Sequence, residues 1–397
     1  MWNPLILQLV AAMFITLPAD TPDELDTKIV HALDFSRQQF IRTVNSSGDS
    51  LLYFRASGPA GEWSTVPTED WTSGFFPGCL WKTYEWCEEK LFRSAAERWT
   101  AGLESQKFNN RTHDIGFMTF CSFGNGYRLT GNSHYKEVLL QAAQTLATRF
   151  NPKIGCIKSW ESGKEWAYPV IIDNMMNLEL LFWASKNGGP APLREIALSH
   201  AQKTMNTHVR SDGGTYHVVD YDTATGEITK KQTHQGYSDE SVWARGQAWA
   251  VYGFTMTFRE TGEARFLATA RKVADFFVDH LPPDGVPYWD FYAPGIPDVQ
   301  RDASAAAIAS SALIELSTLE TDAPRQAKYL SAARRILATL CSPAYLAEGT
   351  GSAGILNHAV GNMPRNGEVD VSLIYADYYF LDAMLRFRGL QSYRAGE

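Results

Sequence analysis

The sequence predicts an all-α fold in which six helical hairpins close into a double ring, an (α/α)6 barrel. Six segments are candidates for inner helices, and two of them, residues 171–184 and 303–313, lack the single apolar stripe of a surface helix, as expected of helices that other helices surround. Each is preceded or followed by a more amphipathic segment, and two stretches of the chain repeat. Two stacked layers of helices would bury every inner face.

The first outer helix is expected over residues 23–44, where apolar residues recur at helical spacing between charged and polar ones. A polar connection rich in Gly, Pro and Ser follows, and a second outer helix is expected over residues 95–106. The inner helices are expected to begin near Trp71, Asp114, Asp173, Arg245, Asp302 and Ser372.

An internal repeat supports the hairpin arrangement. The Arg-x-Thr-Gly turn at residues 128–131 recurs at residues 259–262, and amphipathic helical segments follow both turns. Under the same offset of 131 residues, Asp114 is aligned with Arg245. The two stretches therefore predict the same unit, a helix, a turn and a second helix.

Asp173 heads the most clearly buried of the inner segments. The residues after it are almost all apolar as far as Ala184, and residues 185–190 form a helix stop. A carboxylate at this position could simply cap the helix, because backbone N–H groups and the helix dipole favour negative charge there. An offset of 129 residues aligns Asp173 with Asp302, which heads a helix of small residues.

One β-hairpin is expected between the helices, from residues 213–221 and 227–230. The connecting residues 222–226 are assigned as a turn. The spacing of Asp220, Asp222 and Gly226 does not fit a calcium loop, because the later acidic ligands are missing.

The composition argues against several classes of partner and cofactor. With 36 Lys and Arg against 44 Asp and Glu, the net charge is −8, whereas nucleic-acid binding needs a basic stripe. Beyond the N-terminus no stretch approaches the roughly 20 apolar residues of a membrane span. The 5 cysteines have neither CxxC nor Cys/His spacing, so no disulfide framework, metal or other cofactor is expected. The many aromatic residues suit either sugar binding or a large helical core.

Residues 1–22 are expected to be a signal peptide or an N-terminal extension, and residues 23–397 a single catalytic domain. Residues 4–17 resemble the apolar region of a signal peptide, although the usual positive charges before it are missing. Asn45 and Asn110 fit the glycosylation sequon. Secretion is therefore slightly favoured over a cytoplasmic location.

If the inner helices run parallel, their N-terminal ends meet at one mouth of the barrel. Two acids, a guanidinium, imidazoles and aromatic rings would then share a pocket, an arrangement typical of glycoside chemistry. The residues expected there are Trp71, His113, Asp114, Asp173, Arg245 and Trp249, with His217 and Gln235 from the loops.

Each of these residues also has a structural interpretation. Asp114 could cap its helix, Arg245 could form a buried salt bridge, and the histidines and tryptophans could belong to the core. Two Asp residues at equivalent helix starts, with Arg at a third, are less expected as a set of unrelated caps.

Three motifs resemble the unsaturated glucuronyl hydrolases, glycoside hydrolase family 88. They are DNMMNL at residues 173–178, THQGYSDES at residues 233–241 and WARGQAW at residues 243–249. The resemblance extends from about Trp71 to Arg386, with Ala376 where many relatives carry Gly. It implies an (α/α)6 barrel that removes the 4,5-unsaturated uronic acid left at the non-reducing end of glycosaminoglycan fragments by polysaccharide lyases.

The resemblance also implies a role for each matching residue. Asp173 would be the proton donor and water-activating acid, and Asp114 the second essential acid, which holds the sugar hydroxyls. The implied substrate contacts are His217, Gln235, Arg245 and Trp249, with Trp71 stacking on the sugar and Ser372 near the uronate.

The implied reaction begins with protonation of C4 by Asp173, followed by attack of water at C5. Asp173 must then have a raised pKa, which burial and Asp114 would favour and the helix N-terminus would oppose. We expect burial and the second acid to prevail.

Other functions remain open at this point. A family 105 rhamnogalacturonyl hydrolase would share the barrel and the chemistry but act on pectin fragments. A sugar 2-epimerase or a non-catalytic saccharide-binding protein could also use such a pocket. The sequence specifies neither the preferred glycosaminoglycan and its sulfation nor the oligomeric state.

Overall fold

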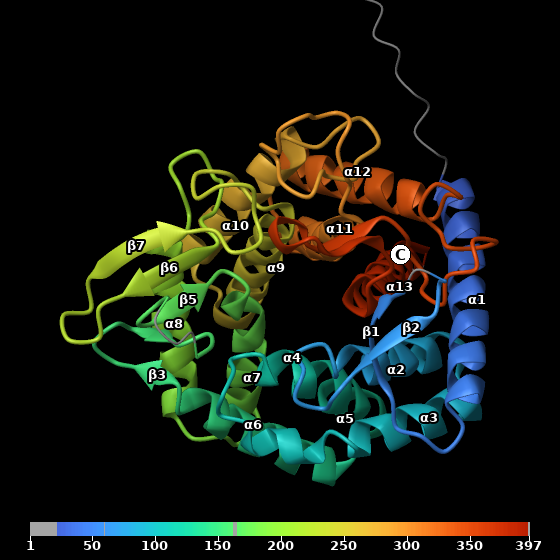
Figure 1. The fold of residues 1–397 in the computed structure, drawn as a ribbon, viewed down its shortest axis with the longest axis horizontal. Helices are drawn as coiled ribbons and strands as arrows, with labels where there is room; N and C mark the ends of the chain where they lie inside the picture. Colours follow the sequence, from blue (N-terminus) through green and yellow to red (C-terminus); the bar gives the residue numbers. More distant parts are fainter. Residues whose placement is uncertain (1–21, 59, 162–164, 396–397) are drawn as a thin grey trace, which may run out of the picture.

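A computed structural model of the protein describes residues 22–395, except for residue 59 and residues 162–164. Its helices form two concentric rings (Figure 1), which confirms the predicted (α/α)6 barrel. The outer ring contains α1 (Pro22–Ser47), α3 (Lys90–Ala101), α6 (Ser133–Ala147), α8 (Pro192–Thr207), α10 (Ala264–Asp279) and α12 (Ala323–Leu340). The inner ring contains α2 (Phe75–Cys87), α4 (Ile115–Thr119), α5 (Asn125–Thr130), α7 (Asn174–Lys186), α9 (Ala244–Thr261), α11 (Ala303–Leu319) and α13 (Ile374–Ala395).

The two rings differ in burial as the sequence pattern predicts. In the inner helix α9 every side chain from Ala244 to Thr257 is buried, and in α11 every one from Ala303 to Ser317. The outer helix α10 buries one apolar face only. An inner helix without a polar face fits only where other helices cover all of its sides.

One inner helix is interrupted. A π-helical turn, η2 (Phe120–Gly124), separates α4 from α5, whereas the sequence predicts a helix from near Asp114 without a break. Just before it, α4 packs very closely on α7. A Cβ atom on Gly116 would lie 2.3 Å from Asn177 Oδ1, so only glycine fits there. This contact brings the starts of α4 and α7 together.

The predicted hairpin is present as β6 (Val218–Tyr221) and β7 (Ile228–Gln232). A third strand, β5 (Pro169–Ile171), pairs with β6 and was not predicted. Because β5 ends two residues before Asp173, this sheet fixes the backbone that leads into α7.

Further short strand pairs were also not predicted. They are β1 (Tyr53–Ser57) with β2 (Trp63–Val66), β3 (Phe150–Asn151) with β4 (Cys156–Ile157), and β8 (Ala359–Asn362) with β9 (Gly367–Val371). A 3-10 helix, η1 (Glu104–Phe108), follows α3, and another, η3 (Met363–Arg365), joins β8 to β9.

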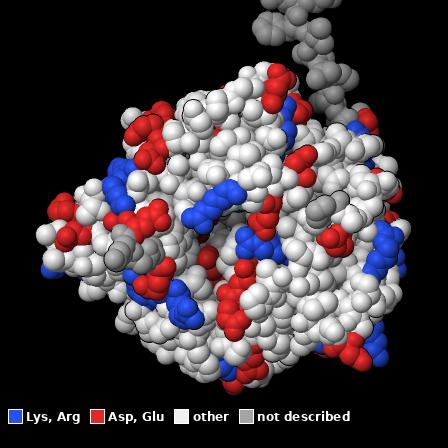
Figure 2. All heavy atoms as spheres, in the orientation of Figure 1, with Lys and Arg blue, Asp and Glu red and all other residues white. Residues whose placement is uncertain are grey.

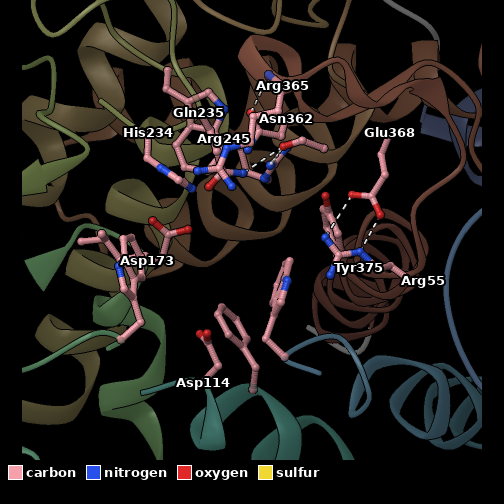
Figure 3. A pocket seen from close by; sticks show the side chains of 16 residues that line it. Arg55, Asp114, Asp173, His234, Gln235, Arg245, Asn362, Arg365, Glu368 and Tyr375 are labelled. Carbon is pink, nitrogen blue, oxygen red and sulfur yellow. Dashed lines mark hydrogen bonds and ion pairs between the residues drawn. The ribbon is translucent and has the colours of Figure 1, made fainter. Parts of the chain in front are cut away.

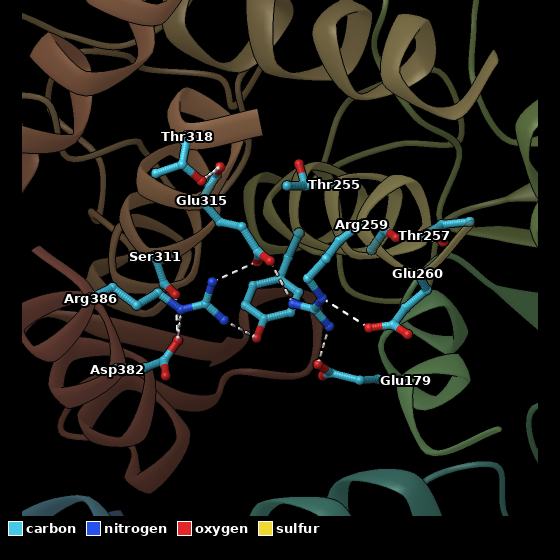
Figure 4. Close-up of polar contacts among 12 residues, drawn as sticks. Glu179, Thr255, Thr257, Arg259, Glu260, Ser311, Glu315, Thr318, Asp382 and Arg386 are labelled. Atoms are coloured by element: carbon cyan, nitrogen blue, oxygen red, sulfur yellow. Dashed lines mark hydrogen bonds and ion pairs between the residues drawn. The ribbon is translucent and has the colours of Figure 1, made fainter. Parts of the chain in front are cut away.

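Further along the inner helices, away from Asp173, a network of partly buried ion pairs joins four of them (Figure 4). Arg259 of α9 contacts Glu179 of α7 and Glu315 of α11, each at 2.5 Å. Arg386 of α13 contacts the same Glu315 at 2.6 Å and Asp382 at 2.8 Å. Every acid in this network has an arginine partner, so the inner helices are joined here by paired groups.

The predictions for the N-terminal segment fall outside the described residues, apart from residue 22. In the described part of the chain, no helix combines the length and the apolar character that crossing a membrane requires. The two sequon residues, Asn45 and Asn110, are both exposed.

Candidate active site

A pocket of about 420 Å³ opens where the inner helices begin. Figure 2 shows basic and acidic side chains close together around this central hollow, and Figure 3 shows Asp114 and Asp173 both directed into it. The lining residues are Arg55, Trp71, Asp114, Phe117, Trp160, Ile171, Asp173, His234, Gln235, Trp243, Arg245, Gly361, Asn362, Arg365, Glu368 and Tyr375. The predicted mouth of the barrel is therefore a single pocket that contains both acids.

Asp173 does not cap the helix that it heads. Its backbone is already helical, with φ −56° and ψ −28°, and its side chain accepts no capping hydrogen bond. The side chain retains 14% exposure, and Oδ1 is buried without a hydrogen-bond partner. Burial raises the pKa of Asp173 to about 7, with Arg245 opposing the rise and Asp114 adding to it. At mildly acidic pH the carboxyl group is therefore protonated.

His217 lies next to Asp173 but is not hydrogen-bonded to it. Its Nδ1 accepts hydrogen bonds from the backbone N–H groups of His234 and Gln235, at 3.2 and 3.3 Å. Burial holds the pKa of His217 well below its usual value, so the ring is neutral. A neutral ring whose Nδ1 accepts must carry its proton on Nε2, and Nε2 lies 3.7 Å from Asp173 Oδ1.

Asp114 is held by neighbours on two sides. Thr112 Oγ1 donates to Oδ2 at 3.1 Å, and Asn177 Nδ2 approaches Oδ1 at 3.4 Å. His113 Nε2 lies 3.2 Å from the same Oδ1, and burial lowers the pKa of this histidine. Asp114 also makes no capping hydrogen bond to its helix. Its carboxylate is thus positioned with its open side toward the pocket.

Arg245 forms the buried ion pair that the sequence allowed as its structural alternative, and it also lines the pocket. Nη1 donates to Asp302 Oδ2 at 3.0 Å and to the Val360 carbonyl oxygen, and Nη2 donates to the Gly361 carbonyl oxygen at 2.6 Å. The guanidinium lies 4.5 Å from the Trp243 ring centroid. Arg245 therefore joins α9 to α11 and to β8 at the pocket wall.

Four other predicted residues differ in their access to the pocket. Trp71 and Gln235 line it, whereas Trp249 and Ser372 do not. Trp249 is buried, with its ring centroid 5.3 Å from those of Phe117 and Tyr379. Ser372 is also buried, and its hydroxyl is hydrogen-bonded to Ser352 and Asn357. His113 and His217, likewise buried, stand behind the two acids.

Sequence reasoning missed the side of the pocket that the strands build. Arg55 of β1 pairs with Glu368 of β9 at 2.5 Å and with Asp70 at 2.9 Å. Asn362 and Arg365 come from the β8–β9 connection. The strands are short and Glu368 has a positive φ of 54°, so no period-2 pattern marks this segment. Within the described residues, no cluster of three or more His, Cys, Asp or Glu could hold a metal ion.

Comparison with known proteins identifies the family to which the chain belongs. The family model described as Glycosyl Hydrolase Family 88 matches residues 55–360, a span that contains both pocket acids and Arg245. The chain belongs to glycosyl hydrolase family 88. It is therefore an enzyme of the glycosidase class, as the motifs around Asp173 and Arg245 predicted.

Similar members of family 88 have been named for their activity. An unsaturated glucuronyl hydrolase of Formosa agariphila is 48% identical over 330 residues, which cover 82% of each chain. An unsaturated chondroitin disaccharide hydrolase of Streptococcus pyogenes serotype M1 is 33% identical over 374 residues, covering 90% of this chain and 91% of the relative. The crystal structure of an unsaturated glucuronyl hydrolase specific for heparin matches with a TM-score of 0.87 and 40% identity, over 94% of this chain and 99% of that one.

Proposed function

We propose that this family 88 enzyme removes the 4,5-unsaturated uronic acid from the non-reducing end of lyase-generated glycosaminoglycan oligosaccharides. The observation that carries the proposal is Asp173, a buried and uncapped carboxyl group with a raised pKa that opens onto a pocket with a second acid. The same activity is named in the relatives that cover most of the chain.

Asp173 begins the reaction as a carboxylic acid. It delivers its proton to C4 of the enol-ether double bond, and the electron pair of that bond forms the new C–H bond. Positive charge then develops at C5 and is shared with the ring oxygen. The neutral His217, whose Nε2 lies 3.7 Å from the same carboxyl group, can donate a hydrogen bond to the carboxylate that forms.

The same carboxylate then acts as a base. It takes a proton from a water molecule while the water oxygen bonds to C5, which returns Asp173 to its protonated state. The product is a hemiketal at C5, which opens the ring and expels the remaining saccharide. No covalent glycosyl-enzyme intermediate is required, so the second acid is free to bind substrate.

The other pocket residues fit the binding of an unsaturated uronic acid. Asp114, with its open side toward the pocket, accepts hydrogen bonds from sugar hydroxyls, and Trp71 offers an aromatic surface for the ring. Three guanidinium groups, those of Arg55, Arg245 and Arg365, line a pocket in a protein whose net charge is −8. Arg55 and Arg245 are paired with acids, whereas Arg365 has no ion pair within the described residues, so Arg365 is the group best placed to meet a substrate carboxylate.

Initial rates on a panel of unsaturated disaccharides test this function. Hydrolysis removes the conjugated double bond, so the ultraviolet absorbance of the substrate falls as the reaction proceeds. Unsaturated chondroitin, hyaluronan and heparin disaccharides should be consumed faster than an unsaturated rhamnogalacturonan disaccharide. The opposite order would favour the pectin-directed alternative, and stable absorbance with every substrate would favour an epimerase or a binding protein.

Members of the panel that differ only in sulfate position sharpen the assignment. One similar structure is described as specific for heparin, and one relative is named for chondroitin disaccharides. The ratio of kcat/KM between the two series therefore assigns the preferred glycosaminoglycan of this enzyme.

A further inference from the structure

Asp302 is a fully buried acid that is not among the residues lining the pocket. It heads α11, where Oδ1 accepts hydrogen bonds from the backbone N–H of Ser304 at 3.0 Å and from its hydroxyl at 2.6 Å. Oδ2 accepts one from Arg245 Nη1 at 3.0 Å. Both oxygens of this buried acid therefore have hydrogen-bond donors, and one of the donors is the guanidinium of Arg245.

Arg245, the ion-pair partner of Asp302, also affects the pKa of Asp173. Arg245 is 1% exposed and lines the pocket, and its charge opposes the raised pKa of Asp173. A nearby unpaired cation typically lowers the pKa of a carboxyl group by about 1 to 3 units. Asp173 nevertheless has a pKa of about 7, and the guanidinium that opposes this rise lies 3.0 Å from an Asp302 carboxyl oxygen.

Other groups around Asp173 come from several elements. Asp114, just before α4, favours protonation of Asp173. His217, just before β6, and His234, in the loop after β7, have pKa values lowered by burial. On the other side of the pocket in Figure 3, Arg55 is paired with Glu368. Arg245 is thus the cation that acts most strongly on the pKa of Asp173.

We propose that Asp302 is a positioning residue of this active site, which holds Arg245 at the pocket wall and offsets its charge so that Asp173 can serve as the proton donor. This inference rests on the proposed function. Its physical basis is the ion pair itself, because a neutral side chain at position 302 would leave an uncompensated guanidinium beside Asp173.

The test is Asp302→Asn in the full chain, read by a ¹³C NMR titration of the Asp173 carboxyl group and by the pH dependence of kcat. Asparagine keeps the acceptor that caps α11 but removes the charge. The freed cation favours the carboxylate of Asp173, so the midpoint should fall by about one pH unit. With a midpoint near 6 instead of 7, the protonated fraction at pH 7, and with it kcat, should fall about fivefold.

Ser304→Ala is the matched control, because it removes a hydrogen bond from the same cluster and keeps both charges. Its titration midpoint should equal that of the unmodified protein. The double variant Arg245→Gln with Asp302→Asn removes both charges and leaves no buried ion unpaired. Because Arg245 lowers the pKa of Asp173 even when it is paired, the Asp173 midpoint in the double variant should lie at or slightly above its original value, and clearly above that of Asp302→Asn.

Two results would overturn the proposal. One is a midpoint that does not move in Asp302→Asn, with kcat lowered equally at every pH. The other is a double variant whose midpoint falls as far as that of Asp302→Asn, which would show that the shift does not come from the charge of Arg245. The NMR titration needs no turnover, so it remains decisive even if the unmodified protein hydrolyses no unsaturated disaccharide, an outcome that would contradict the proposed function instead.

Discussion

Asp173 and Asp302 head inner helices at aligned positions of the internal repeat, yet their carboxyl groups have opposite surroundings. Asp302 has an extended backbone, with φ −123° and ψ 93°, and its side chain reaches back to cap α11. Asp173 has a helical backbone and caps nothing. Asp302 is paired with Arg245, whereas Asp173 has an oxygen without any partner.

The difference shows what distinguishes a structural acid from a reactive one. A capping residue needs a backbone in the β region so that its side chain can accept a hydrogen bond from the first turn of the helix. Asp173 follows β5 with a helical backbone instead, so its side chain cannot cap α7. Its carboxyl group is then buried with neither a cap nor a paired cation, and protonation becomes the less costly state.

The largest effect is expected from Asp173→Asn, which removes the proton donor and keeps the shape of the side chain. The kcat on an unsaturated disaccharide should fall by about 10³-fold, within the range that general acid catalysis contributes. Binding of the disaccharide, measured by calorimetry, should persist. Asp370→Asn is the control, since Asp370 is exposed, does not line the pocket and has a positive φ that Asn tolerates. Equal losses in the two variants would contradict the assignment.

Asp114→Asn should have the next largest effect. It weakens the hydrogen bonds to the sugar hydroxyls, and kcat/KM should fall by about 10²-fold. Because Asp114 helps to keep Asp173 protonated, the fall of kcat with rising pH should also move to lower pH. Thr112→Ala, which removes one donor to Asp114, is the milder control. An Asp114→Asn profile that keeps its original midpoint would show that the two acids do not interact.

Much of this contrast could be predicted from the sequence, because it depends on chain periodicity. The unbroken apolar runs identify the inner helices, and the offsets of 131 and 129 residues place Asp114, Asp173, Arg245 and Asp302 at one end of the barrel. The pairing of Arg245 with Asp302 could not be chosen in advance. It depends on side-chain directions that differ between two helix starts of the same type.

The strand-built side of the pocket was beyond sequence reasoning for a different reason. Arg55 and Glu368 lie 313 residues apart in the sequence and are in contact because β1 and β9 lie next to each other in the fold. The expected substrate contacts Trp249 and Ser372 proved to be buried outside the pocket lining. A motif indicates which residues are near a site, but burial decides which of them a ligand can reach.

The smallest effect on kcat is expected from substitutions in the ion pairs away from the pocket. Although burial opposes it, Arg386 and Lys82 hold the pKa of Asp382 well below its usual value. Asp382→Asn should therefore lower the free energy of unfolding by roughly 3 kcal/mol while kcat changes less than about twofold. Glu85→Gln, which breaks a more exposed pair with Arg128, should cost at most about 1 kcal/mol.

The stability difference between Asp382→Asn and the unmodified protein should depend on pH, because the pKa of Asp382 is lowered in the folded protein. A depressed folded-state pKa stabilises the protein above the ordinary Asp pKa of about 4, and this stabilisation is lost as pH falls. The difference in the free energy of unfolding between Asp382→Asn and the unmodified protein, measured by denaturant titration, should thus become smaller toward pH 3. A gap that stays constant would show that the charge of Asp382 is not what stabilises the barrel.

The pH dependence of kcat in the unmodified protein, between pH 5 and 9, tests whether Asp173 must be protonated for catalysis. A raised pKa means that Asp173 is protonated below about pH 7 and loses its proton as the pH increases. The rate should accordingly be high at mildly acidic pH and decline with a midpoint of about 7. A rate that stays constant across this range would show that no protonated Asp173 is needed, and the mechanism proposed for this pocket would be wrong.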